Sequence, residues 1–196
     1  MRKVLIWVSL LLLAIMVGCL YIVLSPSRKQ ARMAETVPAK GCALGVVVCQ
    51  PSLSAVVLNR VLAFYGSPAS GKGQALYDLG VSYGIDPAYA LAFFMHESSF
   101  GRAGYATITR SLGNIICTPG YSLCVGRFRA YVQWEDGFRD WYRLIRDEYA
   151  ARGLDTVARI IPVYAPSADH NNVSGYVYAV DHAVEVWRSG HVAVNG

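Results

Sequence analysis

The sequence predicts a compact, mainly helical domain with one irregular loop or hairpin lobe, preceded by a single transmembrane helix. Three observations lead to this prediction. Residues 4–24 carry no charge, apolar residues recur at helical spacing after Leu53, and residues 101–133 are rich in Gly, Thr and Ser. The 196 residues have room for one domain plus an appendage, and 54% hydrophobic against 16% charged residues excludes a disordered chain.

Residues 4–24 predict an uncleaved membrane anchor, because about 20 apolar residues span a bilayer and Arg2 and Lys3 precede the run. A cleaved signal peptide is the alternative, with residues 25–27 as a poor cleavage site. Residues 25–40 are polar and basic and contain two prolines, which is typical of a linker. We therefore expect an anchor (1–24), a polar linker (25–40) and one folded domain (41–196).

Four cysteines form two local pairs, Cys42 with Cys49 and Cys117 with Cys124, and each pair encloses six residues. We expect two short-loop disulfides, with three connectivities formally open. A four-cysteine zinc site is the alternative, but structural zinc usually takes ligands about two to four residues apart, so we expect no metal. Disulfides indicate an oxidising compartment. We therefore expect the domain outside the cytoplasm, held at the cell membrane, or secreted if the N-terminal segment is cleaved.

Local signals mark the ends of the expected helices. Residues 66–71 are rich in helix breakers, and Gly153 is a candidate helix end. Asp86 is a candidate N-cap before Pro87, and Asn171 or Asn172 can cap the last helix. The expected helices are Leu53–Tyr65, Gln74–Tyr83, Pro87–Phe100, Trp134–Arg152 and a last helix from Val173 through Trp187. Between the third and fourth we expect loops with at most a small hairpin, and a turn at residues 118–120.

Glu97 is the most informative residue. It follows Phe93 by four residues and Phe94 by three, which places its carboxyl along the apolar side of the expected helix. Burial raises the pKa of a carboxyl, and a carboxyl that keeps its proton near neutral pH can act as a general acid. The alternative is that Glu97 ends the helix and turns into solvent or pairs with an arginine.

The active-site helix and following loop of the lysozyme-like glucosaminidases that cut bacterial peptidoglycan resemble residues 90–101 (ALAFFMHESSFG) and 111–115 (SLGNI) of this chain. These are peptidoglycan N-acetylglucosaminidases with a mannosyl-glycoprotein endo-β-N-acetylglucosaminidase-type domain. Residues 129–142 resemble the segment that leads into the family's long helix after the site, and residues 164–176 resemble its closing tyrosine-bearing motif. The resemblance spans about residues 74–188.

The resemblance implies a lysozyme-like α+β fold and hydrolysis of the β-1,4 bond between N-acetylglucosamine and N-acetylmuramic acid. Glu97 aligns with the catalytic acid, and Tyr176 matches the family's functional tyrosine, with helix packing as the equal alternative for Tyr176. The expected partners are peptidoglycan, or a related glycan containing N-acetylglucosamine, and the membrane through the N-terminal helix. We expect no cofactor. The candidate substrate-binding residues are Ser98, Phe100, Asn114, Arg129 and Tyr131.

The sequence departs from this family in its acidic residues. Glycoside hydrolysis usually takes two carboxylates, yet residues 101–134 contain no Asp or Glu. The second role then falls to Asp169 or to the substrate's own acetamido group, because Glu135 and Asp136 are more simply first-turn charges of a helix. We expect a single-acid mechanism, substrate-assisted or lytic-transglycosylase-like. A catalytically inactive wall-binding module is the alternative from another class.

The net charge of +5 favours an acidic partner. The acid-free stretch carries four arginines that are suited to the carboxylates of peptidoglycan, with ordinary solubilising charge as the alternative. They are Arg102, Arg110, Arg127 and Arg129. We expect no nucleic-acid partner, because the basic residues are dispersed along the chain and an oxidising location excludes chromosomal DNA.

Overall fold

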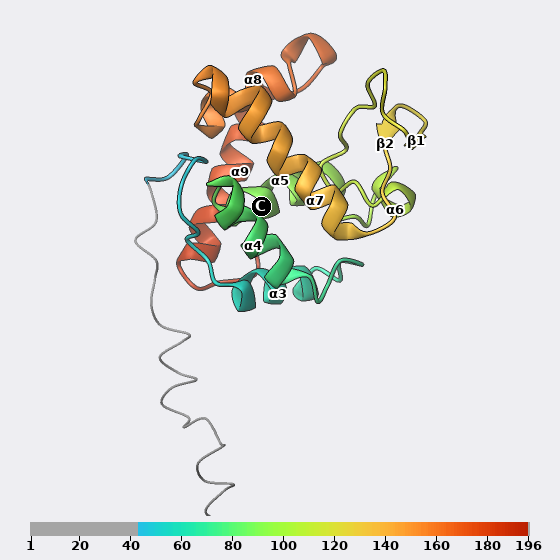
Figure 1. The fold of residues 1–196 in the computed structure, drawn as a ribbon. Helices are drawn as coiled ribbons and strands as arrows, with labels where there is room; N and C mark the ends of the chain where they lie inside the picture. Colours follow the sequence, from blue (N-terminus) through green and yellow to red (C-terminus); the bar gives the residue numbers. More distant parts are fainter. Residues whose placement is uncertain (1–42, 196) are drawn as a thin grey trace, which may run out of the picture. The chain divides into compact units, whose positions relative to one another are not determined.

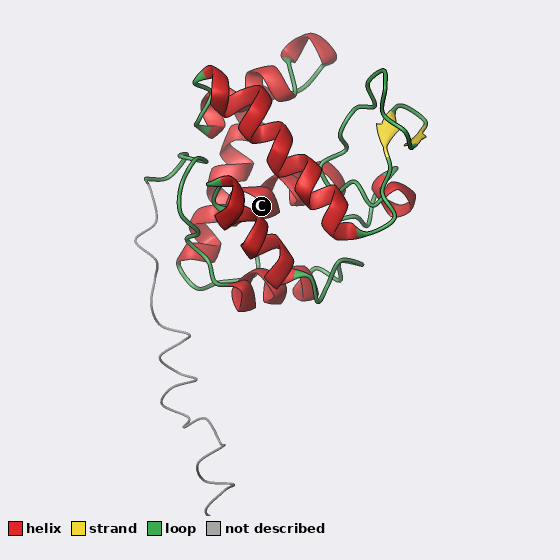
Figure 2. Cartoon of the chain, in the orientation of Figure 1, coloured by secondary structure: helices red, strands yellow, loops and turns green. Residues whose placement is uncertain are grey.

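The computed structural model describes residues 43–195, and in this range the chain is mainly helical (Figures 1 and 2). The helices are α3 (Ala55–Phe64), α4 (Gly73–Tyr83), α5 (Pro87–Ser98), α6 (Ala106–Thr109), α7 (Trp134–Leu144), α8 (Val157–Tyr164) and α9 (Val173–Arg188). A hairpin of β1 (Cys124–Val125) and β2 (Phe128–Arg129) lies between α6 and α7. The predicted anchor and linker lie outside the described residues. Within residues 43–195, no helix is both long and apolar enough to cross a bilayer.

Helix α5 lies at the centre of the described domain. Eight consecutive residues, Pro87–Phe94, are buried, so the first two turns of this helix are enclosed on every side. The predicted cap is confirmed, since Oδ1 of Asp86 accepts a hydrogen bond from the Ala88 amide at 3.0 Å and Pro87 takes the first helical position. Asp86 is fully buried and pairs with Arg188 of α9 at 2.9 Å. The start of α5 is therefore fixed against the last helix.

Two predicted helices end at least two residues earlier than expected. Helix α5 stops at Ser98 rather than Phe100, because Ser99 and Phe100 adopt positive φ angles of 48° and 58°. This left-handed turn brings the Phe100 ring into the core, where it is 1% exposed. The predicted helix Trp134–Arg152 is regular only as α7. The chain continues through a π turn, Ile145–Tyr149, and a short 3₁₀ turn before Gly153 at φ 77°.

Helix α8 was not predicted from the sequence. Pro162 lies inside it, and proline is a strong local signal against a helix. Its burial explains why it forms. Val157, Ile160 and Ile161 are fully buried along one face. Packing of that face thus outweighs the weak local preference.

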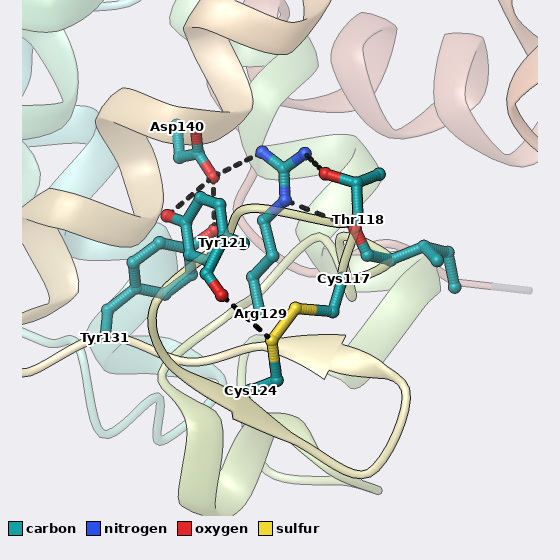
Figure 3. The surroundings of a disulfide bond; sticks show 8 residues. Cys117, Thr118, Tyr121, Cys124, Arg129, Tyr131 and Asp140 are labelled. Atoms are coloured by element: carbon teal, nitrogen blue, oxygen red, sulfur yellow. Dashed lines mark hydrogen bonds and ion pairs between the residues drawn. A yellow bond between two sulfur atoms is a disulfide. The ribbon is translucent and has the colours of Figure 1, made fainter.

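The loop lobe contains the small hairpin that was expected, and also the short helix α6, which was not predicted. In the predicted turn, the Tyr121 amide bonds the Thr118 carbonyl at 3.1 Å and Gly120 has φ 88°. Cys117 and Cys124, the first residue of β1, form a disulfide beside the hairpin, as predicted (Figure 3). The other predicted pair includes Cys42, which lies outside the described residues, so that pairing stays a prediction.

Candidate active site

A cleft of about 750 Å³ opens beside the C-terminal end of α5. Its walls come from separate parts of the chain: the end of α5, the following loop, the hairpin, the π turn after α7, and the segment from α8 into α9. The lining includes Glu97, Asn114, Ile115, Ile116, Thr118, Arg127, Phe128, Arg129, Leu144, Tyr149, Tyr164, Ala165, Ala168, Asp169, His170 and Asn171. The loop lobe and the helical body both contribute, so the cleft depends on how the lobe is held.

Glu97 lies in the last turn of α5 with its side chain half-buried at the cleft wall. Its Oε1 accepts a hydrogen bond from the hydroxyl of Tyr176 at 2.6 Å. Burial raises the pKa of Glu97 above the ordinary value of 4.5, and the Tyr176 hydrogen bond offsets part of this rise. Among the described residues no arginine or lysine pairs with Glu97, so its carboxyl combines a raised pKa with access to the cleft.

Tyr176 lies on α9 and is 3% exposed. Its ring stacks on His96, with centroids 3.6 Å apart and planes 23° apart. Burial and the charge of Glu97 raise the pKa of Tyr176 well above its ordinary value, so its hydroxyl keeps its proton and acts as a donor. Tyr176 therefore both packs in the core and bonds the candidate acid.

Asn114 lies where the loop after α5 passes the end of that helix. Its Nδ2 donates to the carbonyl of Glu97 at 2.8 Å, which satisfies one of the free carbonyls of the last turn. Its backbone has φ 46°, a left-handed conformation that asparagine tolerates better than most residues. This contact fixes the backbone of Glu97 against the loop.

Three of the predicted substrate-binding residues do not line the cleft. Ser98 is buried and donates from Oγ to the Leu112 carbonyl at 2.8 Å. Phe100 lies in the core, and the Tyr131 hydroxyl donates to Asp140 at 2.6 Å. The structure places these side chains where they support the walls rather than contact a ligand.

Arg129 does line the cleft, but its charge is already paired. Its Nη1 lies 2.9 Å from Oδ2 of Asp140, and its Nη2 donates to Thr118 at 3.1 Å (Figure 3). Asp140 on α7 is 5% exposed and also accepts from Tyr121 and Tyr131. Burial alone raises the pKa of Asp140, but the bonds from Tyr131 and Arg129 outweigh it, so the net pKa is lowered. Asp140 thus ties the lobe to α7.

Asp169 is the second carboxylate of the cleft. It lies in a short 3₁₀ turn, Ser167–Asp169, between α8 and α9, and it lines the cleft together with Glu97. The other two candidates lie outside the cleft. Glu135 pairs with Lys72 at 2.6 Å, and Asp136 pairs with Arg139 at 2.8 Å.

Several cleft residues were not singled out as site residues from the sequence. The rings of Tyr149 and Tyr164 form part of the wall, and the Tyr164 hydroxyl donates to the Gly113 carbonyl at 2.6 Å. The sequence placed Tyr149 only within the expected helix Trp134–Arg152, and Tyr164 only in the segment that resembles the closing motif. His96, on α5, is exposed and stacks on Tyr176.

No group of three or more His, Cys, Asp or Glu side chains within residues 43–195 is arranged to hold a metal ion. No protein-family model matches the chain, and the curated proteins give no significant match. A functional assignment therefore depends on the chemistry of the site.

Proposed function

We propose that this protein is a glycoside hydrolase with a lysozyme-like fold that cleaves β-1,4 bonds of the peptidoglycan strand as an N-acetylglucosaminidase. The observation that carries the proposal is the carboxyl of Glu97, which faces a cleft with a raised pKa and a hydrogen bond from Tyr176. A volume of about 750 Å³ falls in the range of small-ligand sites. A protonated carboxyl beside such a cleft is suited to general-acid catalysis, in which it donates its proton to a bound sugar chain.

In the proposed reaction Glu97 gives its proton to the glycosidic oxygen. The bond between that oxygen and the anomeric carbon breaks, the leaving sugar departs as an alcohol, and positive charge develops on the remaining ring. The resulting Glu97 carboxylate faces this charge. The Tyr176 hydroxyl holds one carboxyl oxygen, so the other is free to transfer the proton.

A nucleophile must then complete the reaction. For hydrolysis this is water, and Asp169 is the cleft carboxylate that is suited to deprotonate it or to hold the substrate's acetamido group as that group attacks. In a lytic-transglycosylase-like reaction the muramic residue carries the reacting anomeric carbon instead. Its own hydroxyl attacks that carbon, gives its proton to the Glu97 carboxylate and leaves an anhydro end. The presence of Asp169 supports hydrolysis and weakens the main argument for an inactive wall-binding module. Product analysis separates the routes by a reducing N-acetylglucosamine end or an anhydro-muramic end.

We also propose that the domain works outside the cytoplasm, attached through residues 1–24. The support is the disulfide between Cys117 and Cys124, because such bonds persist in oxidising compartments.

The test compares the full-length chain with Glu97→Gln on purified peptidoglycan, by zymography and by release of reducing ends. We expect the variant to lose about 100-fold or more in rate while it still sediments with the wall. Glu185→Gln is the matched control, because Glu185 is an exposed residue of α9 outside the cleft. Lysis that survives Glu97→Gln would overturn the assignment. Wall binding without any lysis by the wild type would support the binding module instead.

A further inference from the structure

Arg127 differs from the other arginines of the acid-free stretch. Arg129 is paired with Asp140, while Arg102 and Arg110 each donate to a backbone carbonyl and do not line the cleft. Arg127 is exposed and lines the cleft, and no described residue accepts a hydrogen bond or an ion pair from its guanidinium. The positive charge of Arg127 is therefore available to a ligand.

The hairpin holds Arg127 at a defined place. Gly126 and Arg127 form the two-residue turn between the paired residues Val125 and Phe128, and Gly126 has φ 58°. A Cβ at Gly126 would lie 2.9 Å from the Tyr105 ring, so only glycine fits there without a shift. The Arg127 carbonyl accepts from the Cys117 amide at 2.8 Å. The backbone of Arg127 is thus fixed next to the disulfide.

The side chain has an aromatic support. The guanidinium carbon lies 5.3 Å from the centre of the Phe128 ring, which also lines the cleft. Stacking over a ring leaves the edge donors of a guanidinium free, and their planar fork matches the two oxygens of a carboxylate. The cleft acids, Glu97 and Asp169, come from the other walls and do not pair with Arg127. The hairpin tip therefore offers an unpaired anion-binding group.

We propose that Arg127 binds a carboxylate of the glycan and makes the enzyme prefer carboxylate-bearing strands to neutral N-acetylglucosamine polymers. This inference rests on the proposed function and adds a specificity-determining residue to it. Two parts of peptidoglycan supply such a group. The stem peptides carry carboxylates in the intact wall, and the lactyl carboxylate becomes free once the stem peptide has been removed.

The test measures kcat/KM of the full-length chain on three substrates: intact peptidoglycan, peptide-free glycan strands and chitin oligomers. Arg127→Gln removes the charge at similar length, and Arg127→Lys keeps it without the fork. We expect Arg127→Gln to lower kcat/KM about 5- to 10-fold on carboxylate-bearing strands and to leave chitin unchanged, with a smaller loss for Arg127→Lys. Added salt should reduce the wild-type preference. A loss confined to intact wall identifies the stem peptide, and a loss on peptide-free strands identifies the lactyl group.

Arg110→Gln is the control, because Arg110 is an exposed arginine of the same lobe outside the cleft. An equal loss on all three substrates, or no loss on any, would overturn the role of Arg127. Sedimentation with wall or chitin in the Glu97→Gln background gives a readout that needs no turnover. If wild-type lysis is present and selectivity does not change, only the Arg127 proposal fails. If lysis is absent but Arg127→Gln still weakens wall binding selectively, the proposed function fails and the carboxylate site stands.

Discussion

The hydroxyl of Tyr176 on α9 bonds Oε1 of Glu97 on α5 at 2.6 Å, across 79 positions of sequence. This contact lies where the central helix meets the last helix, and His96, next to Glu97 in the chain, stacks on the same tyrosine ring. Tyr176 thus holds the carboxyl of Glu97, and stacking on His96 holds the ring of Tyr176. The orientation of the candidate acid therefore depends on the packing of α5 against α9.

The pKa of Glu97 makes stability depend on pH. Because burial raises this pKa in the folded state, the folded protein binds the proton more tightly than the unfolded chain. The resulting stability is fully present below the ordinary value of 4.5 and is lost as pH rises through the folded pKa. Glu97→Gln cannot ionise, so we expect it to raise Tm at pH 7 and to raise it less near pH 4. Thermal unfolding at both values measures this difference, with Glu185→Gln as the control. A Tm that is lower than wild type at pH 7 would contradict the account.

The pH dependence of activity should also report the ionisation of Glu97. Since the general acid must carry its proton, we expect activity to fall as pH rises through the folded pKa of Glu97, at a pH above 4.5. The pH profile of kcat/KM on peptidoglycan measures this limb. A limb at the pKa of an ordinary exposed carboxyl would argue against Glu97 as the acid.

Tyr176→Phe removes the hydroxyl and keeps the ring. Hydrogen bonds to charged groups contribute about 1.5–3 kcal/mol, so we expect about a 10- to 100-fold loss in kcat from weaker support of the Glu97 carboxylate. The variant should also move the alkaline limb to higher pH, because the bond that lowers the pKa of Glu97 is gone. Unchanged kcat with an unchanged limb would leave Tyr176 a packing role alone.

In the proposed mechanism His96 is a positioning residue, because its ring stacks on Tyr176. Ring stacking contributes about 0.5–1.5 kcal/mol, so His96→Ala should lower kcat by about 2- to 10-fold through a less ordered Tyr176. His96→Phe keeps a ring and should retain most of the activity. Equal losses in both variants would show that the imidazole itself, and not its stacking, is used.

Local features of the fold could be predicted from the sequence. The cap at Asp86 and Pro87 depends on neighbouring residues, and so does the turn at residues 118–120. The N-cap of α9 was narrowed to two asparagines, and Asn172 is the one that accepts from the Gly175 amide. These features follow from propensities that act within a few residues.

Long-range relationships could not be predicted in this way. Helix α8 forms despite Pro162 because its apolar face is buried, which only the tertiary structure shows. Phe100 was a candidate substrate-binding residue, but the left-handed turn at its own backbone directs its ring into the core. Asp140 is buried although it lies on a helix rich in charged residues, and its burial depends on donors from three other positions in the lobe.

We therefore expect Asp140 to contribute more to the free energy of unfolding than its position in the sequence indicates. Asp140→Asn leaves the 13%-exposed Arg129 side chain without its counter-charge, and breaking a buried pair costs about 3 kcal/mol. Asp136→Asn on the same helix breaks an exposed pair and should cost less than about 1 kcal/mol. Urea unfolding of the two variants measures this difference. Similar values would show that Asp140 does not anchor the lobe.

The disulfide between Cys117 and Cys124 should stabilise the lobe and with it the cleft. The two cysteines are seven residues apart, and closing so short a loop in the unfolded chain corresponds to about 2–3 kcal/mol. We expect the double variant Cys117→Ser/Cys124→Ser to unfold at a lower urea concentration than wild type. The backbone amide at position 117, which bonds the Arg127 carbonyl in the wild type, should exchange its hydrogen faster. Lysis should fall as well, because Arg127 and Arg129 both depend on the hairpin. Reductant added to the double variant acts only on the remaining cysteines. If the double variant is as active as wild type and loses activity only when reductant is added, the stabilising disulfide lies elsewhere in the chain.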